Sequence, residues 1–435
     1  MTSAIPFTGK HGRVAIVDGV RTPFARIATH YRALNAIDLG VLVVKEIIGR
    51  NNLDPEDIRQ LVFGMTVMIP EAPFIAREIA LACGYTTMDA YSITRACATS
   101  FQTTASLADN ILAGYTDIGI AGGTDSTSSV RIPLSGQLSA TLRDINFART
   151  TKDKIRLLAG LKVKDLLPQR PSITEYSVGE TMGESTEKMV KKWGVSRAEQ
   201  DDLAHASHSN AARAWKEGRL DRQVMAVTLP DGRRVHEDNL VRLNSERAGY
   251  DKLKPVYDTT SGRGSVTAGN SSPLTDGAGA LLLMSEEKAK SLGYTPLGYI
   301  RSYAFAARDP RDDLLMGPVL AAPIAMDRAG LALSDLTLVD MHEAFAGQVA
   351  CNLRGLNDAA YLKANLGRNR ALGEVDRSIL NVNGGSIAYG HPFGATGARV
   401  IMQMLYELQR RGGGLGLTTA CAAGGIGAAM VLETA

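Results

Sequence analysis

The sequence has little of what marks several protein classes. Only four cysteines occur in 435 residues and none forms a CxxC pair, so neither a zinc ribbon nor a thioredoxin-like motif is indicated. No run of about 18 apolar residues is present, which argues against a transmembrane helix. The net charge of +3 is too small to imply nucleic acid as an obligate partner. Few cysteines, and a start without an apolar or Arg-rich leader, predict a cytoplasmic protein.

Nucleotide and metal motifs are also lacking. The pattern GxxxxGK[ST] does not occur, and the glycine runs 412–416 and 424–427 do not fit GxGxxG between a strand and a helix. A P-loop NTPase and a Rossmann dinucleotide site are therefore unsupported. His205 and His208 lie one helical turn apart without a carboxylate–histidine signature around them. We interpret both as surface residues and expect no metal site.

What is present indicates an α/β protein. Residues 14–17 and 61–67 are β-branched and apolar, typical of buried strands, and residues 38–51 between them are typical of an amphipathic helix. Alternation of this kind favours a mainly parallel sheet covered by helices.

The sequence also predicts a chain built from two similar halves. Residues 52–58, which join a helix to a strand, resemble residues 330–336. The helix 99–113 and strand 117–121 likewise match the helix 396–411 and strand 415–419, with Thr396 aligned on Thr99. The second half is longer between its two matches, and we assign its extra residues to a polar loop at 352–378. The alternative is that any two βαβ units look alike; if the repeat is real, the interface of the halves is a natural place for a site.

A different stretch, 126–254, lies between the halves and is helical and charged. Its most basic part carries a net charge of +5, from three aspartates and eight basic residues: Arg143, Arg149, Lys152, Lys154, Arg156, Lys162, Lys164 and Arg170. Such a segment suits a phosphorylated ligand, an anionic membrane or an acidic partner. The alternative is a solvated helical surface.

Cys97 is the first candidate for chemistry. It lies between a short predicted strand and the helix 99–113, among small residues. A cysteine at a helix N-terminus sees the positive end of the helix dipole, which predicts a lowered pKa and a larger thiolate fraction. His391 stands near the equivalent helix start of the second half, so we expect the two side chains to meet as a nucleophile and its base.

Two further segments follow predicted strands, where α/β proteins place their ligand sites. Cys421 follows the strand 415–419 on a glycine-rich turn, which predicts a thiol exposed to a site and able to move a proton. His342 follows another strand and is a candidate polar group of the same site. Cys83 and Cys351 have no such context, and we interpret both as packing residues.

These residues carry a resemblance to the thiolase family (acetyl-CoA C-acyltransferases), above all to the 3-ketoacyl-CoA thiolases of fatty-acid oxidation related to the trifunctional β chain. The likeness rests on Cys97 in its turn, the segment 342–345, the segment 383–399 around His391, and Cys421. It implies a five-layered αβαβα core of two similar halves with an inserted helical loop domain. The implied boundaries are 1–125 with 255–285, 126–254 for the insertion, and 286–435.

The resemblance also implies a reaction. Cys97 attacks the 3-keto carbon of a 3-ketoacyl-CoA with His391 as its base, Cys421 protonates the acetyl-CoA enolate, and a second CoA takes the acyl group. One oxyanion hole would use His391 and a water held by His342, the other the backbone N–H groups of Cys97 and Ala423. CoA is then a co-substrate, and no permanently bound cofactor is expected.

The family pattern assigns the substrate-contact residues as well. By resemblance Met182 and Phe345 contact the substrate, and Ala268 and Ser272 contact the pantetheine arm. The chain departs from a common pattern at Thr181, where many thiolases have histidine, and at Ala423, where many have glycine. It also has His342 in place of asparagine, which hints at longer acyl chains.

Partners follow by resemblance too: a homodimer or dimer of dimers, and a complex with a hydratase/dehydrogenase α chain. Three rival functions stay open. A biosynthetic acetoacetyl-CoA thiolase is opposed by His342, and a decarboxylating ketosynthase by the second cysteine, Cys421. A catalytically silent scaffold subunit with the thiolase fold is opposed by the intact Cys97, His391 and Cys421.

Overall fold

The computed structural model describes residues 6–168 and 174–434. The chain forms two compact units, Met1–Ser129 with Glu175–Ala435, and Val130–Thr174. The larger unit is built on one mixed sheet with the strand order β11-β12-β13-β10-β2-β9-β6-β4-β5. These strands are β2 (Gly12–Arg21), β4 (Gln60–Gly64), β5 (Asp89–Ser92), β6 (Ile118–Asp125), β9 (Thr275–Ser285), β10 (Gly298–Ala307), β11 (Leu338–Met341), β12 (Gly414–Ala422) and β13 (Ile426–Thr434). Short strands at its margins are β1 (Thr8–Gly9) and β3 (Ala25–Arg26), and β7 (Val227–Thr228) pairs with β8 (Arg234–Val235). The expectation of a mainly parallel sheet is wrong: β4 pairs parallel with β5 and β6, and β11 with β12, but the central strands from β12 to β6 pair antiparallel.

The two halves of the sheet have equivalent strand orders, counted from the centre of the sheet outward. The order β2-β9-β6-β4 on one side repeats as β10-β13-β12-β11 on the other, and β2 meets β10 through only the pairs Ile16–Gly298 and Ala15–Tyr299. The short 3-10 turn η1 (Pro55–Asp57) leads into β4 as η3 (Leu333–Asp335) leads into β11. The predicted internal repeat is thereby confirmed.

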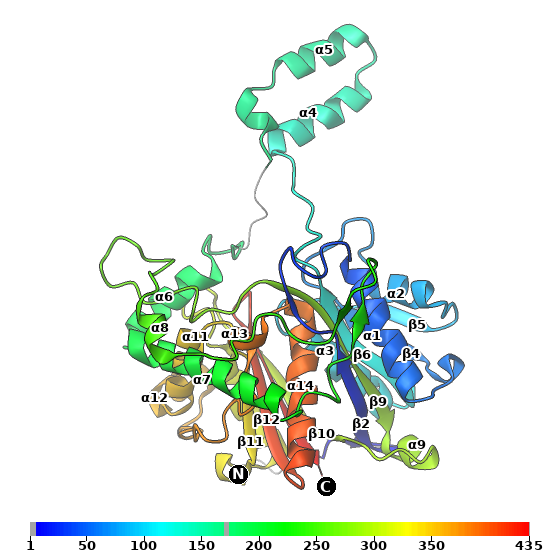
Figure 1. Cartoon of the computed structure of the whole chain (residues 1–435), viewed down its shortest axis with the longest axis vertical. Helices are drawn as coiled ribbons and strands as arrows, with labels where there is room; N and C mark the ends of the chain where they lie inside the picture. Colours follow the sequence, from blue (N-terminus) through cyan, green and yellow to red (C-terminus); the bar gives the residue numbers. More distant parts are fainter. Residues whose placement is uncertain (1–5, 169–173, 435) are drawn as a thin grey trace. The chain divides into compact units, whose positions relative to one another are not determined.

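Helices form layers on the two halves of the sheet (Figure 1). At the centre α3 (Thr99–Leu112) and α14 (Phe393–Arg410) pack against each other, and α14 contacts strands of both halves. On the outer faces, α1 (Ala36–Arg50) and α2 (Ile75–Cys83) cover the first half, and α10 (Gly317–Ala329) with α11 (Ala346–Leu356) covers the second. The result is five layers, αβαβα.

Local sequence explains the central contact. A Cβ atom at Gly397 of α14 would lie 2.7 Å from the Phe101 backbone nitrogen of α3, so only glycine permits this approach. At the outer helix α1, the side chain of Asn35 accepts N–H groups of the first turn, while Asp38 accepts the Asn35 N–H in return. Such ends fix where each helix begins.

The remaining helices of the larger unit are α6 (Met182–Lys192), α7 (Arg197–Lys216), α8 (Arg247–Asp251), α9 (Glu286–Ser291), α12 (Ala359–Leu366) and α13 (Ser386–Tyr389). The prediction of a loop over residues 352–378 is wrong in part, because α11 continues to Leu356 and α12 follows it. The apolar residues of that stretch, such as the fully buried Leu362, pack into the second-half core.

The smaller unit holds α4 (Gly136–Phe147), α5 (Thr151–Ala159) and the 3-10 turn η2 (Val163–Leu166). Side-chain oxygens of Ser135 and Thr150 cap the two helices. It contains most of the basic segment, while Arg170 lies outside the described residues. Among the described residues, no helix is long and apolar enough to cross a membrane.

Candidate active site

Cys97 sits on a strained turn just before α3. It lies two residues before the first helical residue, Thr99, and its neighbour Ala96 has a φ of +46°, a region that side chains other than glycine seldom adopt. The Thr99 hydroxyl supports this turn by donating to the Ala96 carbonyl at 2.7 Å and accepting from the Arg95 N–H at 2.8 Å. Cys97 as a residue is partly exposed, while its thiol group is desolvated.

His391 occupies the corresponding place before α14, two residues ahead of Phe393. The expectation that Cys97 and His391 stand at equivalent helix starts is confirmed, although the helix starts align Thr99 with Phe393 and not with Thr396. The Cys97 sulfur and ring nitrogens of His391 and His342 all lie within 4.8 Å of one another. The two halves therefore bring a thiol and two imidazoles together.

The two histidines are held from behind by hydroxyl groups. The Nδ1 atom of His342 hydrogen-bonds the Ser386 hydroxyl at 2.9 Å, and that of His391 hydrogen-bonds the Thr396 hydroxyl at 2.7 Å. Their rings lie 4.2 Å apart between centroids. Within the described part of the chain, both Nε2 atoms are buried and have no hydrogen-bond partner. Each ring thus has a fixed orientation and one nitrogen free for chemistry.

Cys421 and Ala423 complete the cluster. The Ala423 N–H donates a hydrogen bond to the Cys97 sulfur, and Cys421 is close enough to Cys97 for a thiolate on one to disfavour a thiolate on the other. Ala423 does not have a left-handed φ, so alanine replaces glycine here without strain. The expectation of an exposed Cys421 is wrong: β12 runs on to Ala422, and Cys421 is 1% exposed.

Burial sets the protonation of the site. It raises the pKa of the Cys97 thiol to about 12, against the lowering effect of the Ala423 N–H. Burial, with a further effect of the Arg399 cation, lowers the pKa of His391 to about 3, and the pKa of His342 is lowered well below its usual value. The expectation of a lowered Cys97 pKa is therefore wrong, because desolvation outweighs the backbone N–H groups of Ala423 and Cys97, which lower the pKa. The free site holds a neutral thiol beside neutral imidazoles.

A buried carboxylate ties the turns together. Asp125, at the end of β6, accepts N–H groups of Val67 at 2.6 Å and Gly394 at 2.6 Å, while burial raises its pKa to about 6. It thus links the first half to the start of α14. Sequence reasoning missed Asp125, although its place at a strand C-terminus was a usable signal.

A second buried network fixes the loop before His391. The Glu343 carboxylate accepts from Ser207 at 2.6 Å, from Asn381 at 2.8 Å and from the Ile387 N–H at 3.3 Å. Arg399, fully buried, donates to the Ser386 hydroxyl at 3.2 Å and lies 3.7 Å from Asp340. These hydrogen bonds could not be predicted from the sequence, because Ser207 and Asn381 belong to elements far apart in the chain.

Comparison with known proteins agrees with this geometry. The thiolase N-terminal domain model matches residues 14–287, and the thiolase C-terminal domain model matches residues 294–434. The chain belongs to the thiolase family. A protein named 3-ketoacyl-CoA thiolase from Serratia proteamaculans is 55% identical over 100% of both chains, and one from Pectobacterium atrosepticum is 56% identical over 100% of this chain and 99% of the other.

Solved structures show the same fold. Human mitochondrial 3-ketoacyl-CoA thiolase in complex with CoA superimposes with a TM-score of 0.83 at 27% identity, covering 100% of both chains. The acetyl-CoA acetyltransferase of Bacillus anthracis superimposes with a TM-score of 0.81 at 29% identity, covering 99% of this chain and 100% of the other. The predicted thiolase fold is confirmed.

The residues expected to contact substrate in this thiolase surround one loop. The Ser272 N–H donates to the Ala344 carbonyl at 2.9 Å, and Phe345 is buried with its ring centroid 6.1 Å from that of Tyr257. Ala268 is exposed on the same loop. Met182 is the first residue of α6, and the next residue, Gly183, packs beneath the Tyr257 ring. Ser272 and Phe345 are thus joined to the segment that carries His342.

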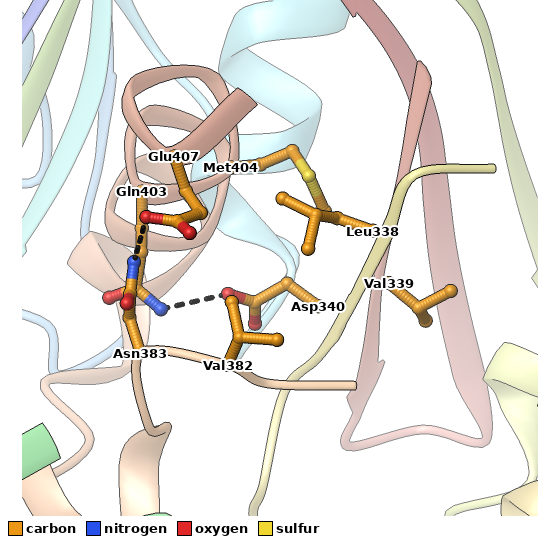
Figure 2. Close-up of a pocket in the computed structure, with 8 residues that line it drawn as sticks. All are labelled: Leu338, Val339, Asp340, Val382, Asn383, Gln403, Met404 and Glu407. Atoms are coloured by element: carbon orange, nitrogen blue, oxygen red, sulfur yellow. Dashed lines mark hydrogen bonds between the residues drawn. The ribbon is translucent and has the colours of Figure 1, made fainter. Parts of the chain in front are cut away.

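Other residues singled out from the sequence lie apart from the thiolase cluster. The surface interpretation of His208 is wrong: it is 3% exposed, and its Nδ1 accepts the Arg242 N–H at 3.2 Å. Cys351 is fully buried, and Cys83 packs against the first-half core. A small pocket has a lining of four polar and four apolar residues (Figure 2), and in it Gln403 donates to Asp340 and Asn383 donates to Glu407. Its lining includes none of the four cluster residues Cys97, His342, His391 and Cys421.

Proposed function

We propose that this chain catalyses the CoA-dependent thiolytic cleavage of 3-ketoacyl-CoA to acetyl-CoA and an acyl-CoA shortened by two carbons. The observation that carries the proposal is the meeting of the Cys97 sulfur with the His391 imidazole from the equivalent helix starts of the two halves. Relatives about 55% identical over their full length bear the name of this activity. The acyltransferase class follows from the family.

In the first half-reaction the Cys97 sulfur attacks the 3-keto carbon while its proton passes to Nε2 of His391. Nε2 is free for this step because Nδ1 is held by Thr396. The C2–C3 bond then breaks, leaving an acyl-enzyme, and the Cys421 thiol protonates C2 of the acetyl-CoA enolate. Concerted proton transfer suits a site whose free thiol and imidazole are both neutral.

Before the second half-reaction the proton held by His391 passes to the Cys421 thiolate, which restores both groups. The thiol of a new CoA then attacks the acyl-enzyme, and its proton passes through His391 to the leaving Cys97 sulfur. The oxyanion at the Cys97 thioester faces the N–H groups of Ala423 and Cys97. We assign the thioester oxygen of the acetyl-CoA enolate to His391 and to a water held by Nε2 of His342, which is unpartnered among the described residues. Met182, Ala268, Ser272 and Phe345 would contact the acyl-CoA.

The decisive experiment measures cleavage of 3-ketoacyl-CoA substrates of four, ten and sixteen carbons through loss of the Mg²⁺-enolate absorbance. Turnover of the two longer chains, abolished by Cys97→Ala, is the expected result. Turnover of the four-carbon substrate alone would instead establish the biosynthetic acetoacetyl-CoA thiolase. Failure at every length, even with an added hydratase/dehydrogenase α chain, would establish a silent scaffold.

The domain division at 125/126, 254/255 and 285/286 stays a prediction, as do a homodimer or dimer of dimers, the α-chain complex and a cytoplasmic location. Light scattering of the purified chain tests the homodimer or dimer of dimers. Co-purification with the hydratase/dehydrogenase α chain tests the complex with that chain.

The smaller unit supports a second, auxiliary function at an anionic membrane surface. Phe147 is exposed at the end of α4, and Ile155 and Leu158 are exposed on α5, which also carries the exposed Lys152 and Lys154. Basic and apolar side chains together suit a lipid headgroup surface. Reversing the charge at Lys152, Lys154 and Arg156 should abolish binding to anionic liposomes while leaving cleavage in solution unchanged. A raised KM for CoA would instead assign the segment to the CoA phosphates, and lost α-chain binding would assign it to that partner.

A further inference from the structure

We propose that the Cys97–His342–His391 cluster binds a soft divalent cation, Zn²⁺ above all, as an inhibitor and not as a cofactor. One sulfur and two imidazoles with ligand atoms within 4.8 Å of one another form a set that zinc prefers. Zinc bonds of about 2.0 Å to nitrogen and about 2.3 Å to sulfur place ligands about 3.5 Å apart. The three side chains therefore need to close by only about 1 Å.

The histidines are already arranged as ligands. In metal sites a histidine commonly binds through one nitrogen while the other donates to an outer oxygen, which fixes the ring. Ser386 and Thr396 supply these oxygens to the Nδ1 atoms of His342 and His391. The Nε2 atoms are buried and, among the described residues, lack any hydrogen-bond partner. A buried hydrogen-bond acceptor without a partner lowers the free energy of unfolding. A bound cation would give both Nε2 atoms a partner at once.

The charges around the cluster permit the cation. Arg399 lies behind Ser386, but Asp340 lies 3.7 Å from its guanidinium and offsets its charge. Asp125 adds a carboxylate on the Cys97 side, where it disfavours a bare thiolate and favours one neutralised by metal. Binding replaces the Cys97 proton: the S–H bond breaks, an S–Zn bond forms, and one proton leaves to solvent.

The consequence for the enzyme is a complete block, because the metal takes the nucleophile and its base together. The fourth zinc position stays open to water, as in other three-ligand zinc sites. Acylation of Cys97 removes the thiolate and so excludes the metal. An asparagine at position 342 would leave only two strong ligands, so His342 is the residue that creates this sensitivity.

The test is a titration of the purified metal-free protein with Co²⁺ as a spectroscopic stand-in for Zn²⁺, followed by displacement with Zn²⁺. We expect one cobalt per chain, with a thiolate-to-cobalt charge-transfer band and the intense visible bands of a tetrahedral site. Cys97→Ala should abolish the charge-transfer band. His342→Asn and Ser386→Ala should each weaken binding by about 10-fold or more.

Cys83→Ala serves as the matched thiol control and should bind like the wild type, since Cys83 lies on α2 outside the cluster. Should Cys97→Ala fold poorly, prior acetylation of the wild type with acetyl-CoA removes the same ligand and should give the same loss. Equal binding by Cys97→Ala and the wild type would overturn the proposal, as would binding unaffected by His342→Asn. The cobalt titrations of the wild type and the variants do not use turnover, so they stand or fall apart from the thiolase activity; the acetylation alone relies on the acyl-transfer step.

Discussion

The rings of His342 and His391 lie 4.2 Å apart between centroids with a tilt of 41°. Two imidazoles at this distance cannot both become imidazolium cations, and burial together with the Arg399 cation holds both rings neutral. The pair can therefore accept one proton, the one that leaves Cys97 as its sulfur attacks. His342 cannot act as a second base and is left to position a water.

Substitutions of the two cysteines should have different effects on the two half-reactions. Cys421→Ala removes the acid that protonates the enolate, so cleavage of 3-ketoacyl-CoA should fall by about 10²–10⁴-fold. Exchange of labelled CoA into acetyl-CoA needs only the Cys97 thioester and should stay near the wild-type rate. Cys97→Ala should lose both reactions. A parallel loss of exchange in Cys421→Ala would contradict the assigned roles.

The Ala423 N–H should contribute to catalysis through the backbone alone. Ala423→Pro deletes this donor to the Cys97 sulfur, and kcat should fall by about 10²–10³-fold. Ala423→Gly keeps the N–H and should stay within a few fold of the wild type. Circular dichroism checks that both variants are folded. Equal activity of the proline and glycine variants would remove Ala423 from the oxyanion hole.

Gly385 should tolerate no side chain. Its φ of −141° suits any residue, but a Cβ atom there would lie 2.3 Å from the Glu343 carboxyl carbon. Gly385→Ala should therefore cost about 1–3 kcal/mol of unfolding free energy by overpacking, and it should lower activity by shifting the loop of His391. Gly49→Ala, at a helical position with open space, is the control and should be neutral or slightly stabilising. Urea unfolding of the two variants decides the matter, and equal midpoints would refute the packing argument.

His208 should make stability depend on pH. Burial, helped by Arg242, lowers its pKa to about 4 in the folded chain, against the ordinary 6.5. The stability from neutral His208 is complete above pH 6.5 and is lost as the pH falls toward 4, because only the unfolded chain then gains the proton. Over this range the wild type should lose up to about 1.4 kcal/mol per pH unit more than His208→Gln. Parallel unfolding curves for the two proteins would show that His208 titrates normally.

The main residues of the site could be predicted from the sequence because its motifs lie at the ends of helices and strands. The repeat placed Cys97 and His391 at matching helix starts, and strand ends located His342 and Cys421. Their protonation was not predictable, since it depends on how deeply the packed halves bury each group. Cys97 illustrates this: a helix N-terminus alone predicts a lower pKa, whereas the folded site raises it.

Supports between distant segments were beyond sequence reasoning. Asp125 joins Val67 to Gly394, and Glu343 joins Ser207 to Asn381, through pairs that no local pattern links. The helix α12 was not predicted, because the burial of its apolar residues becomes evident only in the folded structure. Periodicity sufficed for long helices such as α1, which begins two residues before the predicted start.

The matching helix starts also bear on ancestry. Two identical halves related by a twofold axis would carry the same residue at both starts, giving two thiols or two imidazoles face to face. Neither pair offers a nucleophile together with its base. Fusion into a single chain frees each copy to mutate alone, so the Cys97–His391 pair is chemistry that only a broken symmetry can hold.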